Sequence, residues 1–443
     1  MARFLFATVP AVGHTAPALP IARALVARGH SVRWYTGVAS ADRIAATGAT
    51  FHPITNPDHD YSERGLDGHY PERRELSGIR KLRFDLTQVF AAPVAGQVRD
   101  LMALLDEEPA DVVVGDTGFI GGTLVQDLGG PPLAGFGISV LAFPSRELAP
   151  FGFGLRPAGG PLGRVRNRAM DAAMRKVLFR PMTTEVNKAR QIFGLPPTRA
   201  SVFDFPLATR LYLQFSPPGF EYPVPDIPEQ VRFVGPPRPR PDPTWRPPSW
   251  WDDLAGGRRV VLVNQGTVAT DLDQLVRPAI TALAGERDLL VVAVTGGPDP
   301  AVLGPLPANT RVERFIPFDK LMPRVDVLVT NGGYGGVQLA LSHGVPIVGA
   351  GKTEDKIEVN ARVAYSRVGV DLRTQTPSAE QVRAAVRQVL GDPAFAATAR
   401  RLRAEIEACG REQRAAELLE QLAARGVPRP RVAPASAAAD SPA

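Results

Sequence analysis

Apolar and polar positions in the first half of the chain follow two alternating periods. Short apolar runs predict buried strands, and longer segments with apolar residues three to four positions apart predict helices. The predicted strands span 4–9, 31–36, 50–54, 111–114 and 211–215, and the predicted helices span 19–27, 81–105 and 165–193. Because strands and helices alternate, the pattern predicts a parallel, doubly wound α/β sheet.

The same alternation begins again after a proline-dense segment. Its strands are predicted at 260–263, 289–295, 311–316, 325–330 and 347–350, with helices continuing to residue 425. The prolines between the two series disfavour helix and central strand, so they predict a semi-rigid linker. We expect two Rossmann-like domains with a cleft between them, arranged as an N-terminal domain over 1–216, a linker over 217–250, a C-terminal domain over 251–427 and a disordered tail over 428–443.

The composition narrows the function classes without selecting one. The 443 residues suffice for two domains with their own cores. The formal charge of +6 comes mostly from arginines scattered along helices and proline-rich loops, so it does not predict a nucleic-acid partner. Cys409 is the single cysteine, which excludes a disulfide framework and a cysteine-based zinc site. The chain start is too soon interrupted for a secretory signal, and no apolar run approaches the about 20 residues of a membrane span, so we expect a cytoplasmic protein.

One glycine-rich segment carries more chemical information than any other. An apolar strand at 325–330 leads to a helical pattern at 337–341 through four glycines, Gly332, Gly333, Gly335 and Gly336. Glycines at such a junction let a ligand approach the backbone, and the helix start offers free N–H groups and a positive dipole end. The segment predicts a site for an anionic phosphate group.

Further motifs occur in order along the chain. They are Gly13-His14 with the following 17–22, Asp116 after a strand, the 265–267 loop, the 315–318 segment and Asp355-Lys356. Together with 329–346 they resemble, over nearly the whole chain, the family-1 glycosyltransferases of the two-domain B type, close to the macrolide and antibiotic glycosyltransferases of bacteria. The resemblance implies the GT-B fold, in which two Rossmann-like domains face each other across a cleft.

His14 and Asp116 are candidates for a catalytic pair. His14 stands on a loop at the carboxyl end of the first predicted strand, where such sheets bind ligands, and an imidazole can act as a general base near neutral pH. Asp116 follows a neighbouring strand, from which a carboxylate could hydrogen-bond to the other ring nitrogen. The resemblance implies the same two roles. The alternative is that each side chain caps the helix that follows it.

The resemblance implies that the C-terminal domain binds the nucleotide sugar. The N–H groups at the helix start would stabilise the charge that develops on the leaving diphosphate, so a metal is unnecessary. The implied donor-binding residues are Gly13, Thr267, Phe315, Ile316, Asn331, Gly332, Gly333, Gly335, Gly336, Val337, Asp355 and Lys356. A D-x-D sequence at Asp271 and Asp273 lies at a predicted helix start, where two acids complement the helix dipole. We expect no metal, and no cofactor besides the UDP- or dTDP-hexose co-substrate.

Three positions depart from the family pattern. Asn331 replaces a histidine and brings no positive charge. Phe315 replaces a tryptophan, so it can stack over a base but lacks the indole N–H. Leu339 stands where the family has the ribose-binding glutamate, with Gln338 beside it.

The family's acid–amide pair can be aligned in two registers here. One selects Asp355-Lys356 and the other selects Lys356-Ile357. The first is favoured because an acid can accept hydrogen bonds from sugar hydroxyls, and Glu354 is the alternative acid.

An acceptor pocket is expected in the N-terminal domain. Apolar side chains there, together with a mobile 56–75 loop, suit a small hydrophobic acceptor rather than a protein or a nucleic acid. The candidates are Phe119, Phe143, Phe151 and Phe153, although ordinary core packing explains any one of them equally well.

These features predict an inverting, metal-independent transfer of a hexose to a hydroxyl of a phenolic, polyketide or macrolide-like acceptor, with UDP-glucose favoured as donor. Three alternatives remain: a nucleotide-sugar epimerase of the same fold, a nicotinamide oxidoreductase, and a catalytically silent homologue that only binds donor or partner. Against the oxidoreductase, no G-x-G-x-x-G sequence follows the first strand.

Overall fold

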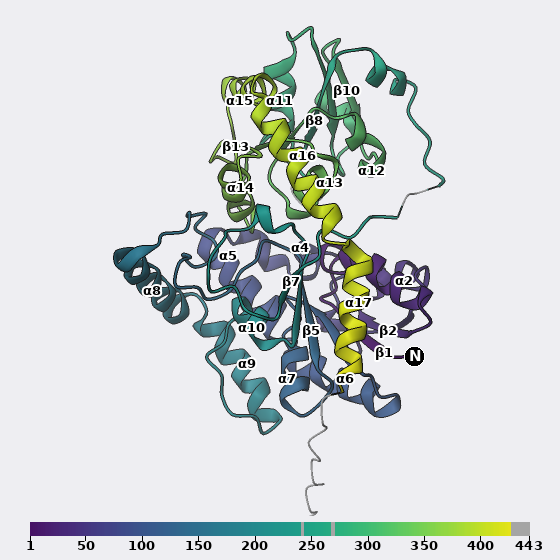
Figure 1. Cartoon of the computed structure of the whole chain (residues 1–443), viewed down its shortest axis with the longest axis vertical. Coiled ribbons are helices and arrows are strands. Elements are labelled where there is room, and N and C mark those ends of the chain that lie inside the picture. The colour runs from purple at the N-terminus through teal and green to yellow at the C-terminus, as the bar shows by residue number, and fades with distance from the viewer. Residues whose placement is uncertain (241–242, 267–270, 427–443) are drawn as a thin grey trace, which may run out of the picture.

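Two parallel β-sheets organise the chain, each within its own α/β domain (Figure 1). The computed structural model describes residues 1–240, 243–266 and 271–426. The N-terminal sheet has the strand order β3-β2-β1-β4-β5-β6-β7 and the C-terminal sheet has the order β10-β9-β8-β11-β12-β13. Both orders reverse direction beside their first strand, at β1/β4 and at β8/β11, and ligands of doubly wound sheets bind at the carboxyl ends of the strands at that point.

The strands are short, and every pairing between them is parallel. Those of the N-terminal sheet are β1 (Arg3–Ala7), β2 (Ser31–Thr36), β3 (Thr50–Pro53), β4 (Val112–Asp116), β5 (Leu133–Gly137), β6 (Leu211–Gln214) and β7 (Val231–Phe233). Those of the C-terminal sheet are β8 (Arg259–Asn264), β9 (Leu289–Val294), β10 (Thr310–Glu313), β11 (Val327–Thr330), β12 (Ile347–Gly349) and β13 (Gly369–Asp371).

Helices connect and cover the strands. In the N-terminal half they are α1 (Val12–Thr15), α2 (Leu19–Ala27), α3 (Ala41–Ala45), α4 (Leu66–His69), α5 (Gly78–Phe84), α6 (Val94–Glu107), α7 (Gly121–Asp127), α8 (Gly160–Val177), α9 (Arg180–Ile192) and α10 (Phe205–Ala208). In the C-terminal half they are α11 (Val276–Leu283), α12 (Phe318–Leu321), α13 (Tyr334–His343), α14 (Lys356–Tyr365), α15 (Ala379–Gly391), α16 (Pro393–Ala408) and α17 (Arg411–Ala424). A π-helical segment, Asp85–Ala91, continues α5.

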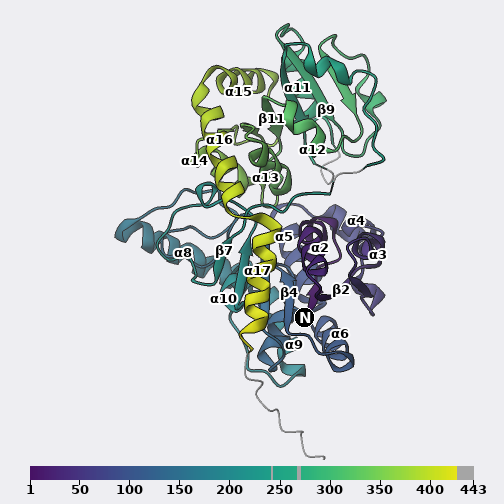
Figure 2. The same ribbon diagram turned by 45° about the vertical axis from the view of Figure 1, so that its right-hand side comes forward.

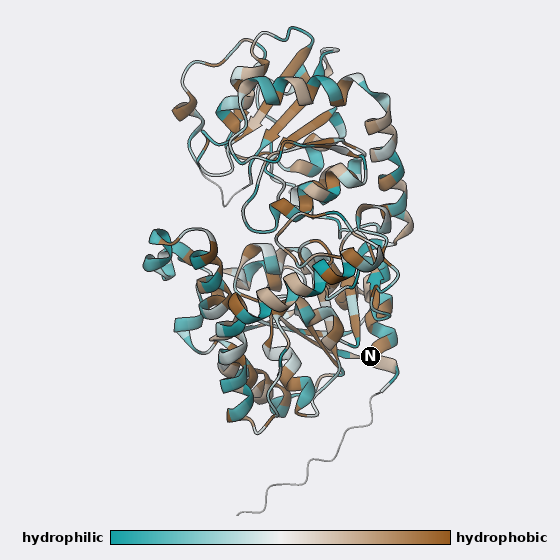
Figure 3. Cartoon of the chain, turned by 90° about the vertical axis from the view of Figure 1, so that its left-hand side faces the viewer, coloured by the Kyte–Doolittle hydropathy of each residue, from teal (hydrophilic) through white to brown (hydrophobic). Residues whose placement is uncertain are grey.

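The cores lie on both faces of each sheet, which is why the strands are almost continuously apolar (Figure 3). All six residues of β9 are buried, and so are all five of β4. None of the helices in the described part of the chain is long and apolar enough to cross a membrane.

Two of the predicted domain boundaries need correction. β7 pairs with β6 inside the predicted linker 217–250, so the N-terminal sheet continues beyond residue 216. The sequence pattern missed this strand because it has only three residues at a sheet edge, where neighbouring prolines are tolerated. β5 and β13 were also not predicted. The tail 428–443 lies outside the described residues.

The second correction concerns the predicted end of the C-terminal domain at residue 427. α17 lies within the predicted C-terminal domain, 251–427, yet it packs beside α2 of the N-terminal domain (Figures 1 and 2). Glu420 on α17 forms an ion pair with Arg28 at 2.9 Å and a hydrogen bond with Nε2 of His30 at 2.7 Å. The C-terminal helix therefore ties the two domains together.

Candidate active site

The His14 and Asp116 side chains meet at the switch point of the N-terminal sheet. His14 lies in α1, directly after β1, and Asp116 is the last residue of the adjacent strand β4. The Nδ1 atom of His14 lies 2.7 Å from Oδ2 of Asp116. Asp116 has no exposed surface, whereas the His14 side chain keeps 18% of its surface exposed. The imidazole can therefore contact a substrate while its carboxylate partner remains shielded from solvent.

Backbone donors hold the Asp116 carboxylate in place. Its Oδ1 accepts a 2.8 Å hydrogen bond from Val9 N–H, and its Oδ2 accepts one of 2.7 Å from Gly118 N–H. A carboxylate that only accepts hydrogen bonds assigns the proton of the neutral imidazole to Nδ1, which leaves Nε2 as the basic nitrogen. Neither side chain caps the helix that follows it, because the N-cap positions of α2 and α7 have no side-chain cap.

The start of α13 presents backbone N–H groups next to open space. A Cβ atom added at Gly335 or Gly336 would meet no atom within 4 Å. Val337, in contrast, already donates its N–H to Gly333 O at 3.1 Å. Of the three predicted amide donors, Gly335 and Gly336 are thus the two suited to an incoming anion. The prediction that Val337 N–H binds the phosphate is wrong, because this N–H forms a hydrogen bond within the helix.

Gly332 is required for the shape of the loop. Its φ is +92°, and an added Cβ would lie 2.3 Å from Oδ1 of Asn360. Asn360, which the sequence analysis missed, is fully buried and donates its side-chain amide to Asn331 O and Gly351 O. It therefore fixes the loop that leads into α13.

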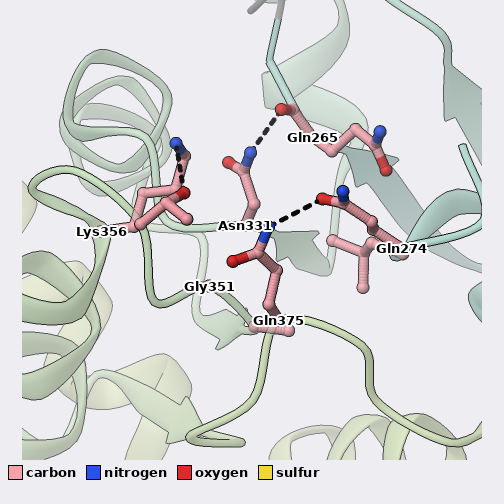
Figure 4. Close-up of a pocket in the computed structure, with 9 residues that line it drawn as sticks. Gln265, Gln274, Asn331, Gly351, Lys356 and Gln375 are labelled. Atoms are coloured by element: carbon pink, nitrogen blue, oxygen red, sulfur yellow. Dashed lines mark hydrogen bonds between the residues drawn. The ribbon is translucent and has the colours of Figure 1, made fainter. Parts of the chain in front are cut away.

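Asn331 also braces this loop (Figure 4). Its Nδ2 donates to Gln265 O, and its Oδ1 accepts from Gly333 N–H at 3.2 Å. The residue is 8% exposed and lines a small cavity of about 10 Å³ together with Gln265, Gln274, Leu275, Ala350, Gly351, Thr353, Lys356 and Gln375. Its predicted contact with the diphosphate remains a prediction, since the structure shows its amide engaged with the backbone. Thr267 lies outside the described residues.

Asp355 and Lys356 are directed to different partners. Asp355 precedes α14 and accepts a 2.7 Å hydrogen bond from Ser139 Oγ of the N-terminal domain. Burial raises the pKa of the Asp355 carboxyl above its ordinary value. Lys356 instead pairs with Glu354 and lines the small cavity. In the alternative register, Ile357 lies next to Gly154 of the N-terminal domain, and its apolar side chain offers no acceptor for a sugar hydroxyl.

The remaining donor candidates differ in exposure. Phe315 is 65% exposed, which leaves a ring face free for stacking, whereas the Ile316 side chain is buried at 1%. Gln338 is buried, and its side-chain amide has no hydrogen-bond partner among the described residues. Leu339 packs against the core.

The four acceptor candidates do not form one pocket. Phe119 is a core residue with 1% exposure and an edge-on contact to Tyr35, so it has no surface for an acceptor. Phe153 is 42% exposed and lines neither of the two cavities described here. Phe143 and Phe151 line a larger cavity, but neither His14 nor Asp116 does.

An aromatic side chain that the sequence analysis missed lies beside the dyad. The Phe90 ring centroid is 6.1 Å from that of His14, and a Cβ added at Gly118 would meet the same ring. Phe90 belongs to the π-helical segment, a feature that is frequent at functional sites and that hydrophobic periodicity does not reveal.

The predicted mobile loop 56–75 contains short helical turns in the structure. Arg73 fastens it by ion pairs with Asp67 and Asp85. Tyr70 lies edge-on to both His69 and Phe84, so the loop presents aromatic rings.

The D-x-D acids have local partners. Asp273 pairs with Arg277 at 2.6 Å, and Asp271 accepts from Asp273 N–H at 3.1 Å. Within the described ranges no group of three or more His, Cys, Asp or Glu residues could hold a metal ion.

Known glycosyltransferases and a family of antibiotic-biosynthesis proteins resemble this chain in sequence. Residues 279–422 match the family described as erythromycin biosynthesis protein CIII-like, C-terminal domain. The chain is 45% identical over 422 residues to 4'-demethylrebeccamycin synthase of Lentzea aerocolonigenes, covering 95% of this chain and 99% of that protein. It is 30% identical over 427 residues to UDP-glucosyltransferase A1 of Starmerella bombicola, covering 94% and 91%.

Solved structures share the fold. The glycosyltransferase of kitacinnamycin superimposes with a TM-score of 0.74 at 24% identity over 95% of this chain and 99% of that one. The calicheamicin glycosyltransferase CalG4 gives 0.73 at 24% identity over 97% and 100%. The prediction of a GT-B fold is confirmed.

Proposed function

This chain belongs to the macrolide and antibiotic glycosyltransferases of family 1, and we propose from that premise that it is an inverting enzyme with His14 as general base. It moves a hexose from a nucleotide diphosphate sugar to a hydroxyl of a small hydrophobic natural product. The observation that carries the proposal is the 2.7 Å contact between His14 Nδ1 and the buried Asp116 carboxylate.

The dyad supplies the proton chemistry. As the acceptor oxygen attacks the anomeric carbon, Nε2 of His14 takes the hydroxyl proton. Asp116 stabilises the imidazolium that forms, and its contacts with Val9 and Gly118 keep it from turning away. Attack on the face opposite the leaving group inverts the anomeric centre.

The C-terminal domain binds the leaving diphosphate and stabilises its charge. Its negative charge grows as the glycosidic bond breaks, and the amides of Gly335 and Gly336 at the positive end of α13 would stabilise that charge. Because these donors are fixed before the reaction, we propose that transfer requires no metal. Thr267, Phe315 and Asp355 remain the candidates for contacts with the phosphate, base and sugar.

UDP-glucose is the proposed donor. The support for this donor is the relative from Starmerella bombicola, which is named a UDP-glucosyltransferase. The acceptor hydroxyl must reach Nε2 of His14, so we assign Phe90 rather than Phe119 to the acceptor wall.

A transfer panel tests the proposal. Purified enzyme is incubated with UDP- and dTDP-hexoses and with phenolic, polyketide and macrolide acceptors, with and without EDTA, and products are identified by mass spectrometry and by the anomeric coupling constant. We expect transfer with inversion, persisting in EDTA. Phe90→Ala should raise the acceptor KM with little change in the donor KM, and Phe153→Ala, an exposed phenylalanine, serves as its control. Retention of configuration would contradict the mechanism.

A further inference from the structure

A cavity of about 270 Å³ lies at the seam between the two domains. Its lining comes from the 141–155 segment, from α8, α9 and nearby loops of the N-terminal domain, and from Glu358 and Arg362 on α14 of the C-terminal domain. Neither member of the catalytic dyad lines it, and none of the donor candidates within the described residues does. An occupant of this cavity would contact both domains.

One wall of the cavity is aromatic. It is built from Phe143, Phe151, Phe179 and Phe203. The Phe151 and Phe203 rings stack at 4.9 Å with an interplanar angle of 24°, and Phe179 lies 5.4 Å from Phe203. Ring faces and edges of this kind suit a flat, apolar molecule.

The lining also contains a buried polar group without a partner. Tyr222 lines the cavity with 4% exposure, and its hydroxyl has no hydrogen-bond partner among the described residues. The Arg362 guanidinium lies over its ring, 4.2 Å from the centroid, and is itself occupied by Glu221 and Glu358. Burial raises the pKa of Tyr222 to about 12, so the hydroxyl keeps its proton as a donor. The hydroxyl oxygen is itself buried, so Tyr222 adds to the apolar character of the lining and not a polar contact for a ligand.

The charges of the lining are unbalanced. Arg175 is paired with Asp171 and Asp204. The guanidinium groups of Arg146 and Arg168 are exposed and form no ion pair in the part of the chain that the structure describes, although the backbone N–H of Arg146 donates to Asp226. Two unpaired cations beside an aromatic wall favour a negatively charged occupant.

We propose that this cavity binds a hydrophobic anion, with an aromatic body against the phenylalanine rings and an acidic group at Arg146 and Arg168. The site goes beyond the proposed function because binding there needs no sugar transfer. Its ligand can be the distal part of a large acceptor or a separate effector, which share this chemistry. Glu358 lies three residues, about 4.5 Å along the helix, from Asp355, so either ligand would sit near the proposed sugar site.

A matched pair of dyes tests the site on the full chain. 1-Anilinonaphthalene-8-sulfonate carries the anion, and N-phenyl-1-naphthylamine has the same rings without it. We expect saturable binding of the sulfonate dye, tighter than that of the neutral dye. The double variant Arg146→Gln/Arg168→Gln should weaken sulfonate binding about tenfold and leave the neutral dye unchanged. Arg80→Gln/Arg180→Gln, two exposed arginines outside the lining, should change neither. Equal affinity of the first double variant and the wild type would overturn the proposal.

A second variant tests whether misfolding, and not loss of the site, explains weaker dye binding. Leu155→Trp places extra volume in the lining and should weaken both dyes, with an unchanged circular dichroism spectrum. Unaltered binding of both dyes to this variant also overturns the proposal. His14→Ala should bind the dyes like the wild type, so loss of transfer and loss of this site are separate results. In transfer assays, a rise of the acceptor KM with the sulfonate dye assigns the cavity to the acceptor, and an unchanged KM assigns it to a separate effector.

Discussion

Ser139 Oγ, at the end of the N-terminal sheet, donates a 2.7 Å hydrogen bond to Asp355 Oδ2, at the start of α14 in the other domain. The same helix accepts from the opposite domain further along, where Glu358 receives the N–H groups of Gly152 and Gly154 at 2.9 and 2.8 Å. The acid proposed to contact the donor sugar is therefore also part of the domain seam. A change at this helix is expected to affect stability and donor binding together.

Asp355→Asn should raise stability at neutral pH while it lowers activity. The folded pKa of Asp355 is raised, chiefly by burial, so between the unfolded value near 3.8 and the folded value the native state binds more protons. The contribution of this carboxyl to the free energy of unfolding therefore falls as pH rises through that window. The uncharged side-chain amide of the Asp355→Asn variant does not titrate, so the variant does not lose this free energy of unfolding as pH rises. Urea unfolding should show the variant more stable than the wild type at pH 7, with the difference shrinking toward pH 3.8.

Ser139→Ala is the matched control for that prediction. It removes a hydrogen bond to the charged carboxylate, so it should lower stability at pH 7 by about 1.5–3 kcal/mol. A stabilised Ser139→Ala variant, or a destabilised Asp355→Asn variant, would contradict the assignment of burial as the main cause.

Asn331→Ala should loosen the loop before α13. It removes the amide that donates to Gln265 O and accepts from Gly333 N–H, with an expected loss of about 1–3 kcal/mol in urea unfolding and weaker UDP binding by calorimetry. Asn331→His keeps a ring N–H for Gln265 and can carry a positive charge, so its UDP affinity should equal or exceed that of the wild type. An alanine variant with wild-type stability and affinity would show that the brace is unimportant.

Arg362→Met tests the buried ion cluster at the seam. Arg362 is 3% exposed and pairs with Glu221 at 2.7 Å and Glu358 at 3.0 Å. Removing the cation leaves buried carboxylates uncompensated, so unfolding should be easier by about 3–5 kcal/mol. Arg238→Met, which breaks the pairs of an exposed arginine with Glu407 and Glu412, should change stability by about 0–1 kcal/mol. Equal effects of the two substitutions would place Arg362 among ordinary surface ion pairs.

Elements with a strong hydrophobic period were predictable from the sequence. The expected strand 31–36 and helix 19–27 match β2 and α2 residue for residue. The meeting of His14 with Asp116 was also predictable, because the carboxyl ends of adjacent parallel strands share one edge of a sheet.

Contacts between the domains were not predictable in this way. The Ser139–Asp355 bond joins residues more than 200 positions apart, and it depends on how the two sheets are placed. The return of α17 to α2 depends on the pairing of Glu420 with Arg28 and His30, which no local pattern encodes. Phe90 was missed because its position beside His14 arises from a π-helical turn.

The most direct test of the central claim compares His14→Ala with the wild type in the transfer assay, with donor binding measured in parallel. A general base contributes about 10²- to 10⁴-fold to the rate, so kcat should fall by that factor while UDP affinity and the melting temperature stay near wild type. A His14→Ala variant with wild-type kcat would contradict the mechanism.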